Sequence, residues 1–152
     1  MNIKLRKAEP RDTPAIIALV KELADSIAET PLITETAVQK YLAFPGKHIL
    51  LAEVDHKQAG MISYSIQPGL YHAANVCVIE ELVTSSAFRR MGIGDALFEK
   101  VMKISKEDRC AELGLGVLKE NTGAIAFYEK HGLEGDAFWM EIHFPEENIN
   151  AF

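Results

Sequence analysis

The spacing of apolar and polar residues changes several times along the chain, and each spacing predicts a different secondary structure. Strict alternation is typical of a half-buried strand, and recurrence at three and four residues is typical of an amphipathic helix. Gly, Pro, Asn and Asp mark the turns between these segments. The patterns predict a strand at Ile3–Ala8, a helix from Asp12 or Thr13 to Glu29, a helix from Thr34 to Phe44, strands at His48–Val54, Ala59–Ile66 and Ala74–Thr84, a helix at Gly92–Lys106, a strand at Glu112–Leu118, a helix at Asn121–His131 and a strand at Ala137–Phe144.

This order of elements predicts the fold class. Strands and helices that follow one another as β-α-α-β-β-β-α-β-α-β favour an α/β (α+β) fold, with a mixed sheet and helices on both of its faces. The chain has 152 residues, which suits a single domain, here residues 1–152, with enough buried surface for a core. On the last predicted strand, Phe138, Trp139 and Phe144 are expected in that core.

The charge balance excludes some classes of partner. The chain has 16 Lys and Arg residues against 22 Asp and Glu residues, a formal net charge of −6, which argues against nonspecific nucleic-acid binding because phosphate contacts need a basic face. No apolar run approaches the ~18 residues of a membrane span. The first residues lack the apolar core of a signal peptide, so we expect a cytoplasmic protein without a membrane partner. The five His residues follow no metal-ligand spacing, and we expect no metal site.

One short basic stretch is unusual in this acidic chain: FRRMGIGDAL, residues 88–97. It lacks the Gly-Lys-Ser/Thr of a P-loop and the third glycine of a dinucleotide-binding loop. Two interpretations stay open. Successive backbone amides at a helix start, with Gly92, Gly94 and the guanidinium groups of Arg89 and Arg90, would bind a phosphate-like anion. Otherwise the stretch is an ordinary solvated turn before a helix.

Two adjacent carboxylates interrupt the apolar strand NVCVIEELVT, residues 75–84. Consecutive strand residues point to opposite faces, so Glu80 and Glu81 are predicted to face opposite sides of the sheet. Because their neighbours mark both faces as covered, at least one carboxylate is expected in a covered region or a cleft. The alternative is a surface glutamate beside a strand bulge. Burial raises the pKa of a carboxyl group, which suits a general base.

Two later segments each allow a structural and a functional interpretation. In ELGLGVL, Gly114 and Gly116 share one strand face, where either a ligand or a helix is expected to approach closely. In the next helix, Asn121 is placed to cap the first turn. Tyr128 follows the apolar spacing of that helix, which by itself favours a core position.

Two segments together resemble the signatures of the GCN5-related N-acetyltransferase (GNAT) superfamily. ELVTSSAFRRMGIGDAL is similar to the family's L-x-V-x-P-x-x-R-x-x-G-x-G segment, and ENTGAIAFYEKHGLE is similar to its N-x-x-A-x-x-F-Y-x-x-x-G-F segment. The departures, such as Ser86 for the usual proline and Leu133 for the usual phenylalanine, remove no group that the chemistry needs. The matching positions are Leu82, Arg89, Gly92 and Gly94 in the first segment and Asn121, Ala124, Phe127, Tyr128 and Gly132 in the second.

The resemblance implies a mostly antiparallel sheet of about six to seven strands, with a splay between the strands at 74–84 and 112–118. It also implies that the cosubstrate is acetyl-CoA. The amides from Arg89 to Gly94 would cradle its pyrophosphate, and the splayed strand around Leu82–Thr84 would pair with its pantetheine amides. The implied cofactor-binding residues are Leu82, Val83, Thr84, Arg89, Arg90, Met91, Gly92, Ile93, Gly94, Asn121, Ala124, Phe127 and Tyr128.

Catalytic roles follow from the same resemblance. A lysine-like amine has a pKa of ~10.4 and is almost wholly protonated at neutral pH, so a base must remove its proton. Glu80 is the first candidate and Glu81 the second, with a bridging water. The Tyr128 hydroxyl would protonate the leaving thiolate. Backbone N–H groups near Val83 would stabilise the oxyanion.

The expected reaction is acetyl transfer from acetyl-CoA to the primary amine of a small molecule, by direct attack in a ternary complex. The opening segment and the WMEI ending are similar to those of diamine and polyamine acetyltransferases, and Tyr64, Tyr71 and His72 are expected near the acceptor. Two alternatives stay open: an acetyltransferase that acts on protein lysines or N-termini, and a non-catalytic acyl-CoA sensor. A homodimer is compatible with the family.

Overall fold

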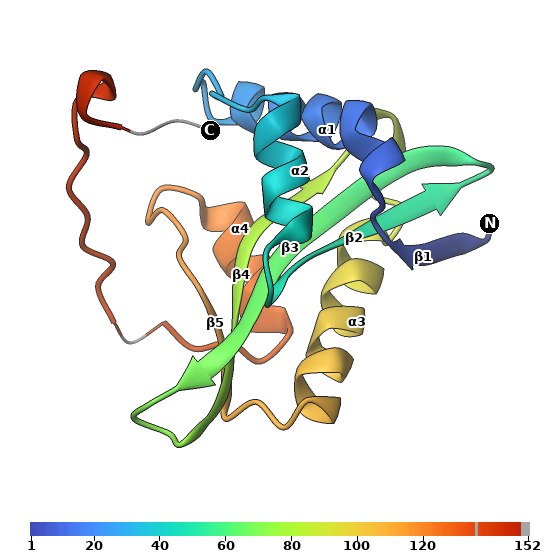
Figure 1. Ribbon diagram of the computed structural model, residues 1–152. Helices are drawn as coiled ribbons and strands as arrows, with labels where there is room; N and C mark the ends of the chain where they lie inside the picture. The colour runs from blue at the N-terminus through green and yellow to red at the C-terminus, as the bar shows by residue number, and fades with distance from the viewer. Residues whose placement is uncertain (136, 150–152) are drawn as a thin grey trace.

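The computed structural model describes residues 1–135 and 137–149, and shows one open sheet with helices on both faces (Figure 1). Most elements begin and end within a few residues of their predicted bounds. In chain order they are β1 (Ile3–Lys7), the short 3-10 helix η1 (Pro10–Asp12), α1 (Thr13–Ser26), α2 (Glu35–Ala43), β2 (Lys47–Val54), β3 (Lys57–Gly69), β4 (Ala74–Thr84), η2 (Ser86–Phe88), α3 (Ile93–Glu107), β5 (Glu112–Leu115), α4 (Thr122–Lys130) and η3 (Glu146–Asn148).

The strands lie side by side in the order in which they occur along the chain. Strands β1 to β4 are antiparallel to their neighbours, and β5 runs parallel to β4. The prediction of a mixed, mostly antiparallel sheet is therefore confirmed. Pairing between β4 and β5 extends only from Val76 to Ile79, whereas β4 continues to Thr84. The predicted splay is confirmed, and it opens beyond Ile79.

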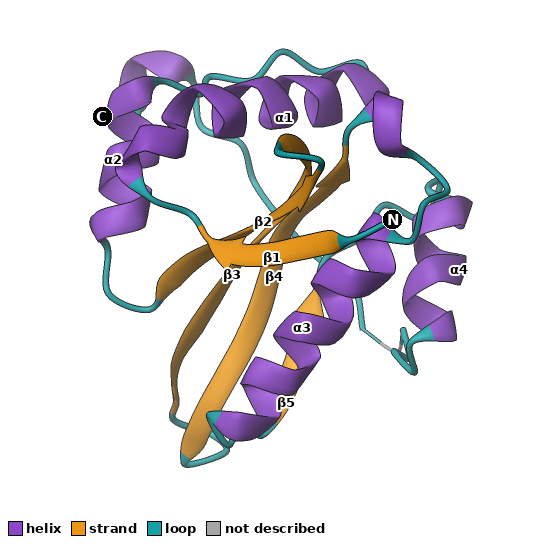
Figure 2. Ribbon diagram, turned by 90° about the vertical axis from the view of Figure 1, so that its right-hand side faces the viewer, coloured by secondary structure: helices purple, strands orange, loops and turns teal. Residues whose placement is uncertain are grey.

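The helices form a layer on each face of the sheet (Figure 2). Side chains of β3 alternate between the two layers, so Met61 faces α1 and α2 while Ile62 and Tyr64 face α3. The core beneath α1 and α2 contains Ile16, Leu19, Val38, Ile49, Leu51, Met61 and Val83. The core beneath α3, with α4 at its margin, contains Leu50, Ala52, Val54, Ala59, Ile62, Tyr64, Cys77, Ile79, Ile93, Leu97, Phe98 and Val101.

Local capping explains where several helices begin and end. The Thr34 hydroxyl accepts a hydrogen bond from the backbone N–H of Ala37 at 3.1 Å, which confirms Thr34 as the N-cap of α2. Helix α1 ends at Ser26 rather than at the predicted Glu29. The reason is that Ala28 has a left-handed φ of 55° and cannot continue a right-handed helix.

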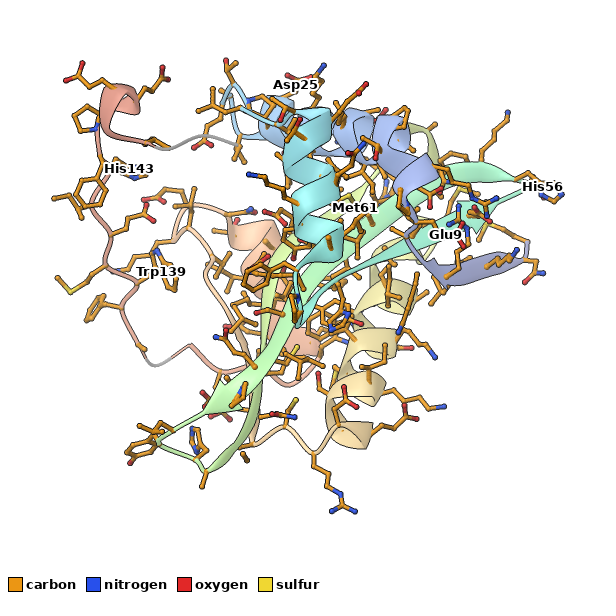
Figure 3. The ribbon with its side chains drawn as sticks, in the orientation of Figure 1. Glu9, Asp25, His56, Met61, Trp139 and His143 are labelled. Carbon is orange, nitrogen blue, oxygen red and sulfur yellow. The ribbon has the colours of Figure 1, made fainter. Side chains whose placement is uncertain are left out.

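The prediction of a last strand at Ala137–Phe144 is wrong, and the described residues form five strands rather than six or seven. Residues 137–144 have no regular structure, and Phe138, Trp139 and Phe144 are exposed rather than in the core (Figure 3). The strand predicted at Glu112–Leu118 also ends early, at Leu115. Strand propensity reflects how well a side chain fits a half-buried sheet surface, and no neighbouring described strand offers that surface to residues 137–144.

An ion-pair network joins β1 to β2 and to the start of α1. Arg6 donates two hydrogen bonds to the Asp12 carboxylate, at 2.7 and 2.8 Å, and its Nε donates a third to Glu53 at 2.8 Å. Asp12 also accepts the backbone N–H of Glu9 at 2.8 Å. The Arg6 hydrogen bonds hold the pKa values of Asp12 and Glu53 below their usual range. Because these side chains are 7% to 21% exposed, the network is shielded from water.

Replacing Arg6 by Met removes the guanidinium donors and keeps an apolar stem. Because Asp12 and Glu53 would then be shielded without their cation, we expect the free energy of unfolding at pH 7 to fall by about 3 kcal/mol. The difference should shrink as the pH falls through the lowered pKa values of Asp12 and Glu53, since the wild type loses this stabilisation there. Urea titrations at several pH values measure both effects.

The matched control is Arg11→Met. Arg11 pairs with Glu9 at 2.7 Å, but the two side chains are 74% and 56% exposed, so we expect a change below about 0.5 kcal/mol. Equal losses in the two variants would contradict a special role for the Arg6 network.

Candidate functional site

Strand β4 has one residue more than its partner β3 at the two adjacent carboxylates. Ser63 pairs with Glu81 and Tyr64 pairs with Ile79, so Glu80 has no partner in the ladder. This is a β-bulge, which bends a strand and redirects its side chains. The prediction that Glu80 and Glu81 face opposite sides is therefore wrong: both carboxylates lie on the side of the sheet that α1 and α2 cover.

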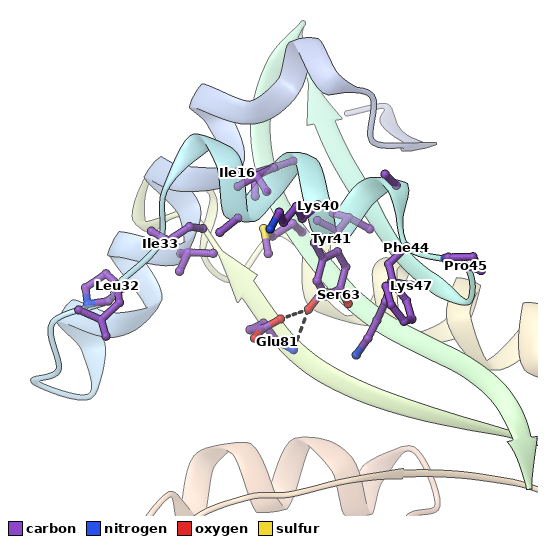
Figure 4. A pocket seen from close by; sticks show the side chains of 17 residues that line it. Ile16, Leu32, Ile33, Lys40, Tyr41, Phe44, Pro45, Lys47, Ser63 and Glu81 are labelled. Carbon is purple, nitrogen blue, oxygen red and sulfur yellow. Dashed lines mark hydrogen bonds between the residues drawn. The ribbon is translucent and has the colours of Figure 1, made fainter. Parts of the chain in front are cut away.

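Glu81 lies at the base of a cavity between α2 and the sheet (Figure 4). The Ser63 hydroxyl donates a hydrogen bond to Oε2 of Glu81, and it accepts the backbone N–H of Glu81 at 3.0 Å. Burial raises the pKa of Glu81, and the neighbouring charge of Glu80 raises it further, whereas the Ser63 hydrogen bond lowers it. The prediction of at least one covered carboxylate is confirmed, and that carboxylate is Glu81.

Glu80 is engaged by two donors from other elements. The Tyr41 hydroxyl of α2 donates a hydrogen bond to Oε2 of Glu80 at 2.5 Å, and the ammonium group of Lys47 forms an ion pair with Oε1. Burial and the Glu80 carboxylate raise the pKa of Tyr41, so its hydroxyl stays protonated at neutral pH. Glu80 thus has its charge compensated by the protein, while the only described side-chain donor to Glu81 is Ser63.

The cavity above Glu81 has a volume of about 750 Å³ and lies between α1, α2 and strands β2 to β4 (Figure 4). Ile16, Val38, Ile49 and Met61 give it an apolar floor and wall. A concave, mostly apolar space with a few polar groups at one point is typical of a small-molecule site. Its polar groups are Lys40, Tyr41, Lys47, Ser63 and Glu81.

Sequence analysis missed three members of this cluster: Tyr41, Lys47 and Ser63. They come from three different elements, and no motif links them to Glu81; the one available signal was a polar Ser63 within an apolar strand. The residues expected near the acceptor lie elsewhere. Tyr64 is 1% exposed in the core beneath α3, and Tyr71 is 95% exposed in the turn after β3, with His72 against it.

The basic turn predicted to bind an anion lies between β4 and α3. Arg90 and Gly92 have left-handed φ values of 63° and 78°, a backbone form that can gather successive N–H groups into a concavity. Arg89 and Arg90 are exposed, and neither guanidinium group has a partner among the described residues. A side chain at Gly92 would meet no described atom within 4 Å. The turn is thus open and basic, and anion binding there stays a prediction.

The splay beyond Ile79 leaves one side of Leu82–Thr84 without a neighbouring strand among the described residues. On β5, an added Cβ at Gly114 would meet no described atom within 4 Å. At Gly116, just after β5, it would meet the Trp139 ring at 3.6 Å. Helix packing is therefore not the reason for either glycine. This face is open at Gly114, where close approach of a ligand stays the other interpretation, and the Trp139 side chain covers it at Gly116.

Helix α4 carries the second signature segment. Asn121 Oδ1 accepts the backbone N–H of Ala124 at 3.1 Å, which confirms the predicted cap. The Phe127 ring lies 3.6 Å from the position a Cβ would take at Gly94. The Tyr128 ring packs on Phe98 with a centroid distance of 5.6 Å, and burial raises the pKa of its hydroxyl. Tyr128 is therefore a protonated donor at neutral pH, with no hydroxyl partner among the described residues.

An ion-pair cluster joins the two signature segments. Lys130 Nζ and His131 Nε2, at the end of α4, lie 2.5 and 2.9 Å from Oδ1 of Asp95 in the first turn of α3. A carboxylate in the first turn of a helix also interacts favourably with the helix dipole. The cluster links the C-terminal end of α4 to the first turn of α3, directly after the basic turn.

Over the described part of the chain, no helix is long and apolar enough to cross a membrane. Within the same residues, no group of three or more His, Cys, Asp and Glu side chains is placed to hold a metal ion. Cys77 and Cys110 are both free thiols.

Residues 17–133, well over half of the chain, match the sequence profile of the acetyltransferase (GNAT) family. A thialysine N-epsilon-acetyltransferase of Caenorhabditis elegans is 26% identical over 99% of this chain and 97% of its own. The thialysine N-epsilon-acetyltransferase of Sus scrofa is 23% identical over 96% of this chain and 94% of its own. A crystal structure of a transcriptional regulator from Bacillus halodurans superposes with a TM-score of 0.85 at 23% identity, over 94% of this chain and 100% of that chain, and shows the same fold.

The environment of Glu81 predicts a variant that is more stable than the wild type. The native state raises the pKa of Glu81 and so favours its protonated form. Above that raised pKa, ionisation of the buried carboxyl group costs stability, and Gln has no such cost. We expect Glu81→Gln to raise the Tm at pH 7 to 8, with the gain disappearing below about pH 4, where the wild-type carboxyl group is protonated in both states. Calorimetry across this pH range measures the difference.

Glu80→Gln makes the same atomic change at the neighbouring, exposed carboxylate. Because Glu80 is compensated by Lys47 and Tyr41, we expect no gain in Tm for this variant. A Tm of Glu81→Gln below that of the wild type at pH 8 would contradict the cost assigned to ionisation of Glu81.

Proposed function

Because this chain belongs to the acetyltransferase (GNAT) family and is an acetyl-CoA-dependent N-acetyltransferase, we propose that it acetylates the primary amine of a small molecule by direct attack within a ternary complex. The observation that carries the proposal is the half-buried carboxylate of Glu81 at the base of the 750 Å³ cavity, whose pKa is raised by burial. The names of the thialysine acetyltransferases with which the chain aligns along nearly its whole length support a small amine as acceptor. A concave, mostly apolar space also suits a small amine better than a folded protein surface.

The general base in this proposal is Glu81, either directly or through one water molecule. An effective base has a pKa near the working pH, and burial moves Glu81 in that direction. Glu80, the first candidate from the sequence, already accepts a hydrogen bond from Tyr41 and an ion pair from Lys47. We therefore assign Glu80 a positioning role: it holds Tyr41 and Lys47 at the wall of the cavity.

Tyr128 is proposed as the general acid. Its hydroxyl is protonated at neutral pH because burial raises its pKa. Protonation of the sulfur as the thioester bond breaks would prevent the thiolate from attacking the new amide. The ring is held by Phe98 and by Phe127, at centroid distances of 5.6 and 5.3 Å, so the hydroxyl has a defined position.

The basic turn and the splay are proposed to hold acetyl-CoA, which supplies the activated acetyl group. The left-handed residues Arg90 and Gly92 and the start of α3 would present backbone N–H groups to the pyrophosphate. Leu82, Val83 and Thr84 lie where β4 has no described strand on the β5 side and would pair with the pantetheine amides. Phe127 packs on Gly94, and Asn121, Ala124 and Tyr128 extend the same wall along α4. Met91 and Ile93 would contribute backbone only.

The assignment of Glu81 predicts a pH-dependent loss of activity. We expect Glu81→Gln to lower kcat/KM about 100-fold or more at pH 7, where few amine molecules are deprotonated without help. The loss should become smaller toward pH 9.5, because the acceptor then supplies its own free base. Steady-state rates of thiol release with a panel of amines measure this profile.

The matched variant Glu80→Gln should lose only severalfold and keep the wild-type profile, because Glu80 is proposed to position Tyr41 and Lys47 only. If Glu80→Gln loses more kcat/KM than Glu81→Gln, Glu80 rather than Glu81 is the general base. Tight coenzyme A binding without turnover of any amine would favour the non-catalytic acyl-CoA sensor.

The proposed pyrophosphate site predicts a selective loss of affinity. Arg89→Ala combined with Arg90→Ala should raise the Kd of coenzyme A at least tenfold, since hydrogen bonds to charged groups are lost. The Kd of acetyl-pantetheine, which lacks the phosphates, should not change. Isothermal titration calorimetry measures both ligands, and the exposed Arg109→Ala at the far end of α3 is the control. If the Kd values of both ligands rise equally, the two arginines support the folded structure rather than bind the pyrophosphate.

A further inference from the structure

We propose that the acceptor is an amine with a single cationic centre on an apolar body, such as an alkylamine or an aryl-alkylamine, and that diamines and polyamines are poor substrates. This inference rests on the proposed function and names the substrate class of the same cavity. It differs from the expectation based on sequence similarity, which favoured diamine and polyamine acceptors. Three features of the cavity support it: its lining, its charges and its rim.

The first feature is the apolar lining. The floor of the cavity is packed core, formed by side chains that are each at most 5% exposed: Ile16, Val38, Ile49 and Met61. Val20 and Ile33 also line the cavity and are only half-buried, so the protein presents accessible hydrocarbon to whatever extends beyond Glu81. Such a wall favours methylene groups or an aromatic ring, which lose contact with water on binding. It offers nothing to the ammonium groups farther along a polyamine.

The second feature is the distribution of charge. Glu81 is the one carboxylate among the described residues that line the cavity, and the side chain of Lys47 also lines it. Glu80 is not a lining residue, and its charge is compensated by Lys47. One substrate ammonium group can therefore be received at Glu81. A second ammonium group in the cavity would be desolvated and would find no second carboxylate among the described lining residues.

The third feature is the rim. Leu32, in the loop between α1 and α2, is 71% exposed, and Phe44, just after α2, is 63% exposed, yet both also line the cavity (Figure 4). Large apolar side chains exposed at the mouth of a cavity mark surface that a ligand covers. Glu29 and Glu35 flank the same loop but do not line the cavity. An apolar body leaving the cavity would thus meet Leu32 and Phe44 before any carboxylate.

These features orient the acceptor within the proposed reaction. The amine nitrogen lies at Glu81, and the apolar body points along Ile49 and Met61 toward Leu32 and Phe44. The amine nitrogen forms the new C–N bond as the C–S bond of the thioester breaks. Glu81 takes the first proton from the ammonium group and passes it to solvent. The nitrogen loses its second proton as the tetrahedral intermediate collapses, and this proton restores Tyr128 after Tyr128 has protonated the leaving sulfur.

Hexylamine and hexamethylenediamine test the proposal, because they share one carbon chain and differ only in the second ammonium group. We expect kcat/KM at pH 8 to be at least tenfold higher for hexylamine, a ratio of the size that pocket contacts support. 2-Phenylethylamine should behave like hexylamine, and spermidine like the diamine. Equal or higher kcat/KM for the diamine or for spermidine would overturn the proposal, as would faster acetylation of a peptide N-terminus or lysine.

Two variants test whether the rim determines this preference. Leu32→Glu places a carboxylate at the mouth of the cavity on an exposed side chain, and we expect it to reduce the preference for hexylamine at least fivefold by improving the diamine. Leu70→Glu is the matched control, since Leu70 is 99% exposed in the turn after β3 and does not line the cavity. An unchanged preference in Leu32→Glu would show that the rim does not contact the acceptor, against the proposal.

Binding of the two amines to the complex with coenzyme A separates this inference from the proposed function. If hexylamine binds more tightly than the diamine but no amine is acetylated, the proposed acetyl transfer is refuted and the preference of the cavity for an apolar monoamine is supported. Turnover with a preference for diamines would support acetyl transfer and refute the substrate class.

Discussion

A single extra residue in the central sheet sets the geometry of the site. The bulge at Glu80 opposite the Ser63–Tyr64 step puts two neighbouring carboxylates on one side of β4. In a regular strand, one of them would point into the apolar core beneath α3, where Ile79 and Leu82 lie. An unpaired carboxylate in that core would be strongly unfavourable. The bulge places both carboxylates beneath α1 and α2, where polar partners are available, and β4 separates from β5 directly beside it.

The two carboxylates then differ because their partners differ. Glu80 is compensated by Lys47 and Tyr41, which join the start of β2 and helix α2 to the bulge. Glu81 is buried with the Ser63 hydroxyl as its described side-chain donor, and its pKa is raised as a result. The carboxylate of Glu80, which is paired with Lys47, holds the cavity wall in place. The carboxylate of Glu81, which has no ion pair among the described residues, is the one available for proton transfer in the proposed reaction. Burial raises the pKa of Glu81, and this has two consequences. The ionised carboxylate lowers the stability of the native state, and the same carboxylate becomes the stronger base that the proposed reaction needs.

The second half of the molecule carries the basic turn and the helix of Tyr128. Asp95 ties the end of α4 to the first turn of α3 through Lys130 and His131. Tyr128 packs on the face of the sheet opposite the cavity, whereas the segment before the basic turn is bonded to α1, because Ser85 and Ser86 donate hydrogen bonds to Glu22. The proposed sites of the two substrates are formed by different residues. Acceptor specificity can therefore vary with the lining of one cavity while the cosubstrate site is kept.

The order of the elements, the helix caps at Thr34 and Asn121, and the family could be predicted from the sequence, because these depend on local periodicity, turn chemistry and two short motifs. The sequence did not determine the direction of Glu80, because a bulge exists only in the register between two strands. It also missed Ser63, Tyr41 and Lys47, which come from three elements without a shared motif. The segment 137–144 has strand-like residues but no described strand beside it, because pairing is a property of neighbours in space. Tertiary structure decided which carboxylate is buried and what lines the cavity above it.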